Sequence, residues 1–129
     1  MDFETHFQQL SQAYLQHLAN ADLAALLQLF APAAEVLSPL YGRQPATDFY
    51  RQLFSDTNQS KLQWKDTLIN NSNQSACIFF EYSWTLATGE VVRFDVIDYV
   101  QLNDSGQINF LQIVYDTVQS RPALDKVGN

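Results

Sequence analysis

The sequence predicts one α+β domain, with helices in the first half of the chain and an antiparallel sheet in the second. Up to Thr57, apolar residues recur at spacings of three and four, the period of amphipathic helices. After Thr57, apolar and polar residues alternate in runs that short turn sequences separate, as in an antiparallel meander. Helices that precede a meander in sequence pack against it as a second layer.

Three helices are expected in the first half. The first spans roughly residues 2–19, and its apolar face consists of Phe3, Phe7, Leu10, Tyr14 and Leu18. Asp22 is the expected N-cap of a second, short helix that ends near Pro32 and buries Leu23, Leu26, Leu27 and Phe30. A short strand and a turn follow in residues 34–42. Pro45 is the expected first residue of the third helix, whose apolar face consists of Phe49, Tyr50, Leu53 and Phe54.

Four strands are expected in the second half, in residues 61–69, 76–87, 91–102 and 108–118. The turns between them contain the Asn, Asp or Gly residues that tight connections need. We assign residues 1–119 to a single domain and residues 120–129 to a C-terminal tail that is expected to fray.

The composition of the chain argues against several classes of partner and cofactor. A net charge of −7 disfavours nucleic acid and anionic membranes as partners. Cys77 is the single cysteine, so no intrachain disulfide is expected, and no segment resembles a signal peptide or a membrane span. A cytoplasmic protein is therefore expected. His6 and His17 lack a nearby acidic pattern, and there is no glycine-rich phosphate loop, so we expect no metal and no cofactor.

One carboxylic acid interrupts an apolar strand face. Asp98 follows Val92, Phe94 and Val96 on that face and precedes Val100 and Leu102. On the inner face of a curved sheet, the acid loses hydration, which raises its pKa and favours a neutral form that donates a hydrogen bond. Two alternatives stay open: a polar group that is satisfied within the core, and a β-bulge that turns the side chain outward.

Three segments of the chain resemble the bacterial ketosteroid isomerases, a branch of the nuclear transport factor 2-like, or SnoaL-like, superfamily. The first is "AYLQHLANADLAALLQLFAPAAEVLSP", where the likeness runs from Tyr14 to Pro39 without a gap. The others are "YGRQPATDFYRQLF" and "VIDYVQLNDSGQI". The resemblance implies a cone-shaped, cystatin-like roll, in which a curved antiparallel sheet wraps around three helices and holds a ligand in its mouth.

The resemblance also implies roles for individual residues. In the isomerase branch, a tyrosine of the first helix and a protonated aspartic acid of a late strand form an oxyanion hole, and Tyr14 and Asp98 occupy these positions. Ser38 stands where the family has its general base, an aspartate before a proline. The residues expected to line the pocket are Phe54, Val96 and Tyr115.

Because Ser38 stands where the family has an aspartate, the expected function differs from that of the ketosteroid isomerases. A serine hydroxyl cannot take an α-proton near neutral pH without a base of its own, so classical steroid isomerisation is not expected. We expect a protein with an apolar pocket that binds a small hydrophobic, carbonyl- or phenol-bearing molecule through Tyr14 and Asp98. The alternative is an isomerase, dehydratase or cyclase-type enzyme for a steroid-like or polyketide-like substrate. Glu35 is expected to be solvated, and His17 either lines the mouth or lies at the helix edge.

The outer face of the predicted sheet is more apolar than contact with water requires. Val91, Ile97 and Tyr99 lie in phase on that face. An exposed apolar patch is a usual mark of an interface, so we expect a homodimer that forms through this surface.

Overall fold

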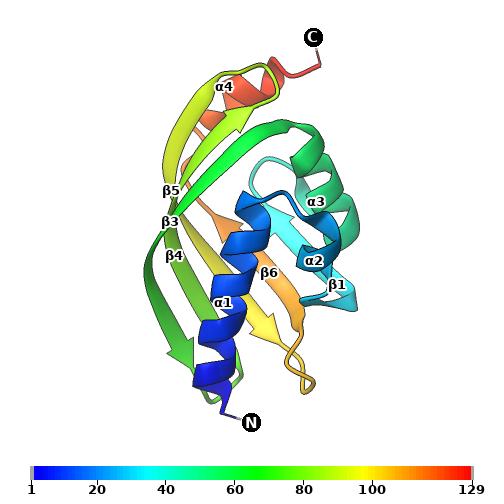
Figure 1. Ribbon diagram of the computed structural model, residues 1–129, viewed down its shortest axis with the longest axis vertical. Helices are drawn as coiled ribbons and strands as arrows, with labels where there is room; N and C mark the ends of the chain where they lie inside the picture. The colour runs from blue at the N-terminus through cyan, green and yellow to red at the C-terminus, as the bar shows by residue number, and fades with distance from the viewer. Residues whose placement is uncertain (1, 129) are drawn as a thin grey trace.

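The computed structural model describes residues 2–128, which form a curved six-stranded sheet with helices in its concavity (Figure 1). The helices are α1 (Phe3–Ala19), α2 (Leu23–Leu27), α3 (Ala46–Ser55) and α4 (Ser120–Asp125). The strands are β1 (Phe30–Ser38), β2 (Gly42–Pro45), β3 (Thr57–Asn70), β4 (Ser75–Leu86), β5 (Val91–Leu102) and β6 (Ile108–Val114). The predicted α+β class is confirmed.

The sheet has the strand order β2-β1-β6-β5-β4-β3. Strands β3 to β6 form the predicted antiparallel meander. The sheet as a whole is mixed, because β1 pairs with β6 in parallel. This pairing covers what would otherwise be the free edge of β6. The sequence did not predict it, because a parallel partner so distant in the chain leaves no local signal.

The segment after α2 differs from the prediction. The second helix was expected to include Phe30, but it ends at Leu27, and β1 begins at Phe30. Phe30 is instead buried as the first residue of β1, where it pairs with Ile108 of β6. Pro32 lies where the register of β1 against β6 is irregular, so its missing N–H removes no regular ladder bond.

The ends of several other helices and strands differ from the predicted ends by a few residues. Asp22 caps α2 as predicted, since its side chain accepts a hydrogen bond from the Ala25 N–H at 3.2 Å. Pro45 ends β2 and is the N-cap of α3, rather than its first residue. Strand β3 begins at Thr57, earlier than predicted, and β6 ends at Val114 rather than Val118.

Strand β3 contains two register irregularities against β4, between Thr57 and Gln59 and between Trp64 and Asp66. Each inserts an extra residue into β3 but not into β4, and such bulges bend a strand and increase its twist. The bends let the long outer strands curve around α1 (Figure 1).

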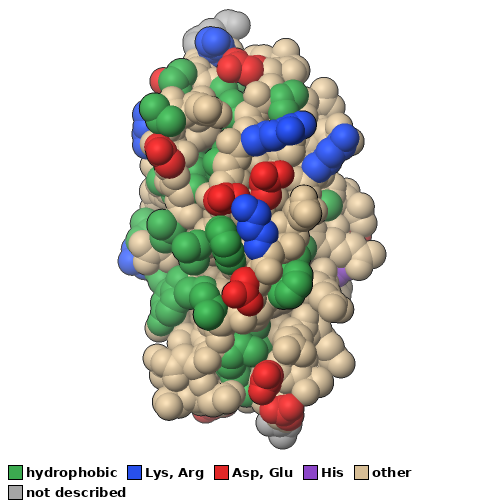
Figure 2. Space-filling model, turned by 90° about the vertical axis from the view of Figure 1, so that its left-hand side faces the viewer, with side chains coloured by type: hydrophobic (Ala, Val, Ile, Leu, Met, Phe, Trp, Pro, Cys, Tyr) green, Lys and Arg blue, Asp and Glu red, His purple; other side chains and the backbone are tan. Residues whose placement is uncertain are grey.

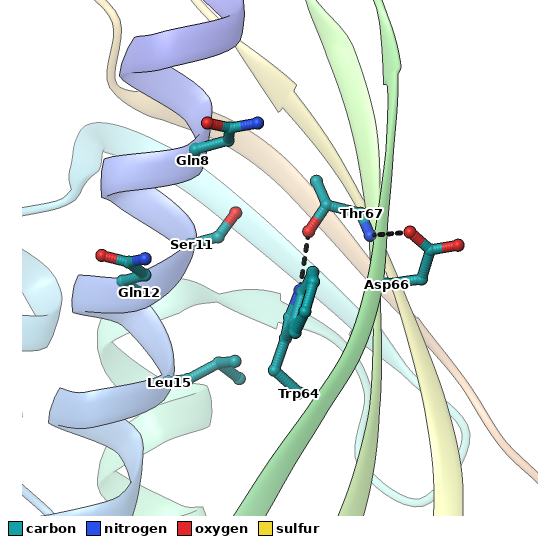
Figure 3. Close-up of a pocket in the computed structure, with 7 residues that line it drawn as sticks. All are labelled: Gln8, Ser11, Gln12, Leu15, Trp64, Asp66 and Thr67. Atoms are coloured by element: carbon teal, nitrogen blue, oxygen red, sulfur yellow. Dashed lines mark hydrogen bonds between the residues drawn. The ribbon is translucent and has the colours of Figure 1, made fainter.

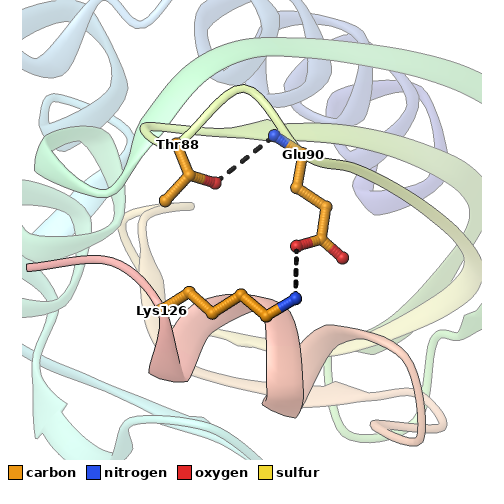
Figure 4. Close-up of polar contacts among 3 residues, drawn as sticks. All are labelled: Thr88, Glu90 and Lys126. Atoms are coloured by element: carbon orange, nitrogen blue, oxygen red, sulfur yellow. Dashed lines mark hydrogen bonds and ion pairs between the residues drawn. The ribbon is translucent and has the colours of Figure 1, made fainter. Parts of the chain in front are cut away.

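Residues 120–128 are ordered, so the expectation that the C-terminal segment frays is wrong for this part of it, and residue 129 lies outside the described residues. The segment forms α4, at the end of the molecule opposite to the N-terminus (Figure 1), with Ser120 and Ala123 fully buried. The Arg121 guanidinium donates a hydrogen bond to the Pro39 carbonyl at 2.9 Å. Lys126 Nζ lies 3.3 Å from Glu90 Oε1, in the turn between β4 and β5 (Figure 4). These contacts attach α4 to two separate turns.

No helix within residues 2–128 is both long enough and apolar enough to cross a membrane.

Candidate functional site

Asp98 lies on the inner face of the sheet, as the period-two pattern of β5 predicts. It pairs with Ile78 of β4 on one side and with Ile113 of β6 on the other, and it is only 1% exposed. Among the described residues, neither carboxyl oxygen has a hydrogen-bond partner. Buried polar groups are nearly always paired, so an unpaired carboxyl at the centre of a core is a marked exception.

Two tyrosines lie beside this carboxyl. Tyr14 of α1 and Tyr50 of α3 are both fully buried, and their hydroxyl oxygens are 2.7 Å apart, within one hydrogen bond. The rings meet edge to face, with centroids 6.2 Å apart. From the sequence, Tyr50 was expected only as one of the apolar residues of its helix. The signal that identifies it is its hydroxyl, because a tyrosine on a buried helix face needs a partner for that group.

Burial sets the protonation of all three groups. Loss of hydration raises the pKa of Asp98 to about 8, and the nearby Tyr14 hydroxyl opposes part of this shift. That hydroxyl is close enough to influence the carboxyl, but its hydrogen bond is with Tyr50. Desolvation also raises the pKa of Tyr14 and of Tyr50, with Asp98 adding to both shifts. Near neutral pH the cluster therefore contains three protonated oxygen acids.

A small cavity of about 30 Å³ lies within the cone, on the side of the sheet that Asp98 faces. Its walls are Tyr41, Phe49, Leu53, Tyr82, Trp84, Phe94, Val96, Ile113 and Tyr115. Ile113 is the cross-strand neighbour of Asp98, and Phe49 precedes Tyr50, so the cavity is next to the cluster. A void of this size has room for about one water molecule.

Two of the three residues expected to line the pocket form part of this wall. Val96 and Tyr115 do so, whereas Phe54 packs against the ring of Tyr50 at a centroid distance of 6.3 Å and lies outside the wall. The rings of Tyr115 and Phe94 stack with centroids 4.4 Å apart and planes 21° from parallel. This stack narrows the cavity.

Ser38 is buried, but its hydroxyl has a local structural task. It accepts a hydrogen bond from the Tyr41 N–H at 3.0 Å, in the turn between β1 and β2. Glu35 lies at the surface, where one of its carboxylate oxygens is 3.2 Å from the Arg43 guanidinium. The structure therefore does not bring Glu35 to the position that the family's base occupies.

A second carboxylate near the cavity was missed by sequence analysis. Asp56 follows α3 and is 8% exposed. Its Oδ2 accepts hydrogen bonds from the Tyr41 hydroxyl at 2.8 Å and from the Gln52 amide at 3.1 Å. The pKa of Tyr41 is raised by burial and by this carboxylate, so Tyr41 remains a donor. The pair joins residues of a turn and a helix end, which no sequence spacing indicates.

The histidines and the cysteine lie elsewhere. His17 is in the last turn of α1 and half-buried, and His6 Nε2 is 2.8 Å from the Gly106 carbonyl oxygen. Cys77 is half-buried, and desolvation raises the pKa of its thiol. Residues 2–128 contain no group of three or more His, Cys, Asp or Glu side chains placed to hold a metal ion.

Comparison with known protein families shows the family to which the chain belongs. The model of the SnoaL-like domain matches residues 11–110, which is most of the sequence. The protein belongs to the SnoaL-like domain family. A comparison with curated proteins finds no match.

Solved structures show the same fold at low sequence identity. An NTF2-like protein of unknown function from Burkholderia pseudomallei has a TM-score of 0.79 at 14% identity, over 92% of this chain and 97% of that one. A protein with a cystatin-like fold from Methylobium petroleophilum has a TM-score of 0.74 at 18% identity, over 89% and 78%. TerC, co-crystallised with polyporic acid, has a TM-score of 0.76 at 15% identity, over 92% and 97%. The predicted cystatin-like fold is confirmed.

The pKa of Asp98 makes stability depend on pH. The folded-state value of about 8 is above the value of about 3.9 expected in the unfolded chain, so the folded state keeps a proton that the unfolded state releases. The free energy of unfolding therefore falls as pH rises from about 4 to about 8, by up to about 1.4 kcal/mol per pH unit from this group. Asp98→Asn cannot ionise and should remove that slope in urea denaturation.

The matched control for this experiment is Asp95→Asn, an exposed acid on the same strand. It should leave the slope between about pH 5 and pH 7 unchanged. A slope that is identical in wild type and Asp98→Asn would contradict the assigned ionisation.

Proposed function

We propose that the protein binds a small apolar molecule whose phenol or carbonyl oxygen accepts hydrogen bonds from the cluster of Tyr14, Tyr50 and Asp98. The observation that carries this proposal is the Asp98 carboxyl, which is buried and without a partner. A buried acid without a partner lowers the free energy of unfolding. A ligand oxygen that accepts a hydrogen bond from the protonated carboxyl would supply the missing partner. Perturbed groups of this kind cluster at functional sites.

The surroundings of the cluster favour an apolar ligand. All nine cavity-wall residues are aromatic or aliphatic, and one of them, Tyr41, has its hydroxyl bonded to Asp56. Ligand sites commonly combine such a wall with a few convergent polar groups.

Two observations favour binding over catalysis. The side chain of Ser38 is a hydroxyl rather than a carboxylate. Its oxygen already accepts a hydrogen bond from the Tyr41 N–H in the turn between β1 and β2. The other carboxylate near the cavity, Asp56, accepts bonds from Tyr41 and Gln52. The Asp56 carboxylate is therefore occupied in positioning Tyr41 and Gln52. Neither group therefore has the properties of a general base for abstraction of an α-proton.

A ligand larger than one water molecule requires the cavity to widen. We expect the cavity to widen at the stacked pair of Phe94 and Tyr115, because both rings belong to the cavity wall and both are only half-buried. Rotation of these side chains enlarges the cavity without breaking a strand ladder. The TerC structure shows that a protein of this fold can be co-crystallised with polyporic acid, an aromatic molecule that bears hydroxyl and carbonyl groups.

Titration with β-naphthol tests the proposed binding. The naphtholate should be bound by the donors of the cluster, each worth roughly 1–3 kcal/mol to a charged acceptor. Tyr14→Phe and Asp98→Leu should therefore weaken binding by about fivefold to 150-fold, measured by the absorbance of the probe. Asp98→Asn keeps a donor and should retain most of the affinity.

Tyr99→Phe is the matched control for Tyr14→Phe, because Tyr99 lies on the outer face of the sheet, with its hydroxyl bonded to Gln101. It should leave the affinity unchanged. Equal affinity in wild type, Tyr14→Phe and Asp98→Leu would refute the donor roles.

Restoring a carboxylate at position 38 tests why catalysis is not expected. Wild type should have negligible activity on a simple unsaturated steroid ketone, and Ser38→Asp should gain roughly 10²- to 10⁴-fold. Ser38→Asn is the control, because its amide oxygen can accept the same turn hydrogen bond but cannot act as a base. Substantial activity of wild type would show that another group is the base, and no gain in a folded Ser38→Asp would show that the donors are not placed for this reaction.

We also propose that the protein forms a homodimer through the outer face of the sheet. Ile97 and Val114 are paired neighbours on that face and are 42% and 50% exposed, and Figure 2 shows apolar side chains gathered across it. One pair of charged side chains on this face is neutralised within the chain: Lys65 Nζ is 2.7 Å from the Asp95 carboxylate and lies over the Phe79 ring. An apolar centre beside such a pair suits a self-complementary contact.

Sedimentation at about micromolar concentration tests the dimer. Wild type should sediment as a dimer, and Ile97→Glu should sediment as a monomer, because two carboxylates would be buried across the symmetry axis. Gln9→Glu, on the exposed side of α1, adds the same charge outside the face and should remain dimeric. Monomeric wild type would contradict the proposal.

A further inference from the structure

A wide groove separates α1 from β3, at the edge of the sheet that β3 forms. Its volume is about 530 Å³, within the range of small-molecule sites. The residues that line it are Gln8, Ser11, Gln12, Leu15, Trp64, Asp66 and Thr67. Figure 3 shows Gln8, Ser11 and Leu15 pointing from α1 toward β3, and Trp64 and Thr67 pointing back. None of these residues takes part in the proposed cluster of Tyr14, Tyr50 and Asp98.

The bulge in β3 explains how the groove is formed. Trp64 pairs with Phe80 and Asp66 pairs with Phe79, so Lys65 is an extra residue that has no partner on β4. Phe80 is buried on the inner face, and Thr67 pairs with Ile78, which is also buried. The inserted residue therefore brings Trp64 and Thr67 to the same inner side of the strand, three residues apart, while Asp66 points away from α1 (Figure 3).

The indole of Trp64 is oriented but not covered. Its ring N–H donates a hydrogen bond to the Thr67 hydroxyl at 2.8 Å, which satisfies the one polar group of the ring. The side chain is nevertheless 57% exposed, although it lies on the inner face of the sheet. Trp84, the other tryptophan, lies on β4 and is 2% exposed. A large aromatic ring with a satisfied N–H and an open face is a platform for stacking.

The α1 side of the groove supplies two free amides: that of Gln8 points toward β3, whereas that of Gln12 points away from β3 and reaches a ligand in the groove after rotation of its side chain (Figure 3). Gln8 and Gln12 are one helical turn apart on α1, both are exposed, and neither amide has a hydrogen-bond partner within residues 2–128. The Ser11 hydroxyl is already used, since it donates to the Phe7 carbonyl at 2.8 Å. Leu15 extends the apolar part of the wall toward Trp64 (Figure 3). No Lys or Arg lines the groove.

We propose that this groove binds a neutral, polyhydroxylated ring, such as a pyranose, stacked on Trp64 and hydrogen-bonded by the amides of Gln8 and Gln12. The C–H bonds on the face of a pyranose are weakly positive and suit the negative face of an indole. Amide side chains both donate and accept, as sugar hydroxyls do. This site is separate from the proposed function and does not depend on it.

The composition of the groove argues against other ligands. An anion has no cationic side chain to pair with, and the chain has a net charge of −7. A fully apolar ligand would cover two amides without replacing their bonds to water. A second copy of the chain is the remaining occupant for an exposed indole, and the experiment distinguishes it.

The test uses ¹H–¹⁵N NMR of the indole N–H signals of the two tryptophans. Methyl β-D-glucopyranoside, whose substituents are all equatorial, and cellobiose should shift the Trp64 signal saturably, with dissociation constants in the millimolar range. The Trp84 signal should not move, because Trp84 is buried and its N–H is bonded to Thr57. Sorbitol is the control probe, since it has the hydroxyls but no rigid ring face.

Variants identify the residues responsible. Trp64→Ala should weaken binding at least about tenfold, followed through backbone amide signals of α1, and Gln8→Ala with Gln12→Ala should also weaken it severalfold. Leu68→Ala is the matched control: it removes another exposed apolar side chain of β3, 61% exposed, and should leave the affinity unchanged. Shifts that sorbitol reproduces, that survive Trp64→Ala, or that are absent would overturn the proposal. A Trp64 signal that instead depends on protein concentration would assign the groove to a second copy of the chain.

Discussion

An unpaired carboxyl group lies at the centre of the sheet, and the donor site proposed with Tyr14 and Tyr50 is built around it. Asp98 is held between two neighbouring strands, where an apolar residue would be more stable. Burial keeps it protonated near neutral pH, since desolvation raises its pKa to about 8. The Tyr14 and Tyr50 hydroxyls lie beside it and bond to each other instead of to it. The fold therefore maintains a set of neutral donors with capacity left for a further acceptor.

The architecture explains why these three groups meet. Tyr14 comes from α1, Tyr50 from α3 and Asp98 from β5, and only a sheet that curves around the helices brings the three elements together (Figure 1). The parallel pairing of β1 with β6 extends the sheet over α3, and the bulges of β3 bend it around α1. The same bulge that bends β3 at Lys65 also creates the groove beside Trp64. One local irregularity thus contributes both to the curvature of the sheet and to the groove between α1 and β3.

The sequence predicted the parts of this arrangement that leave a periodic signal. Strict alternation along β5 fixes the face on which Asp98 lies, and the spacing along α1 fixes the buried side of Tyr14. It did not predict Tyr50 as the partner of Tyr14, or Asp56 as the acceptor for Tyr41, because these contacts join elements that are distant in the chain. The bulge at Lys65 was missed because the letters "KLQWKDTLI" fit plain alternation nearly as well. The burial of α4 was missed because its few apolar residues form no repeat.

Titration of the Asp98 carboxyl carbon by ¹³C NMR observes the protonation of this group itself in the folded protein. The signal is assigned by comparison with Asp98→Asn, in which it is absent. We expect a midpoint near 8, with the carboxyl protonated at neutral pH. A midpoint near the ordinary aspartate value of about 3.9 would mean that Asp98 is a hydrated anion, and it would contradict the donor site proposed for this fold.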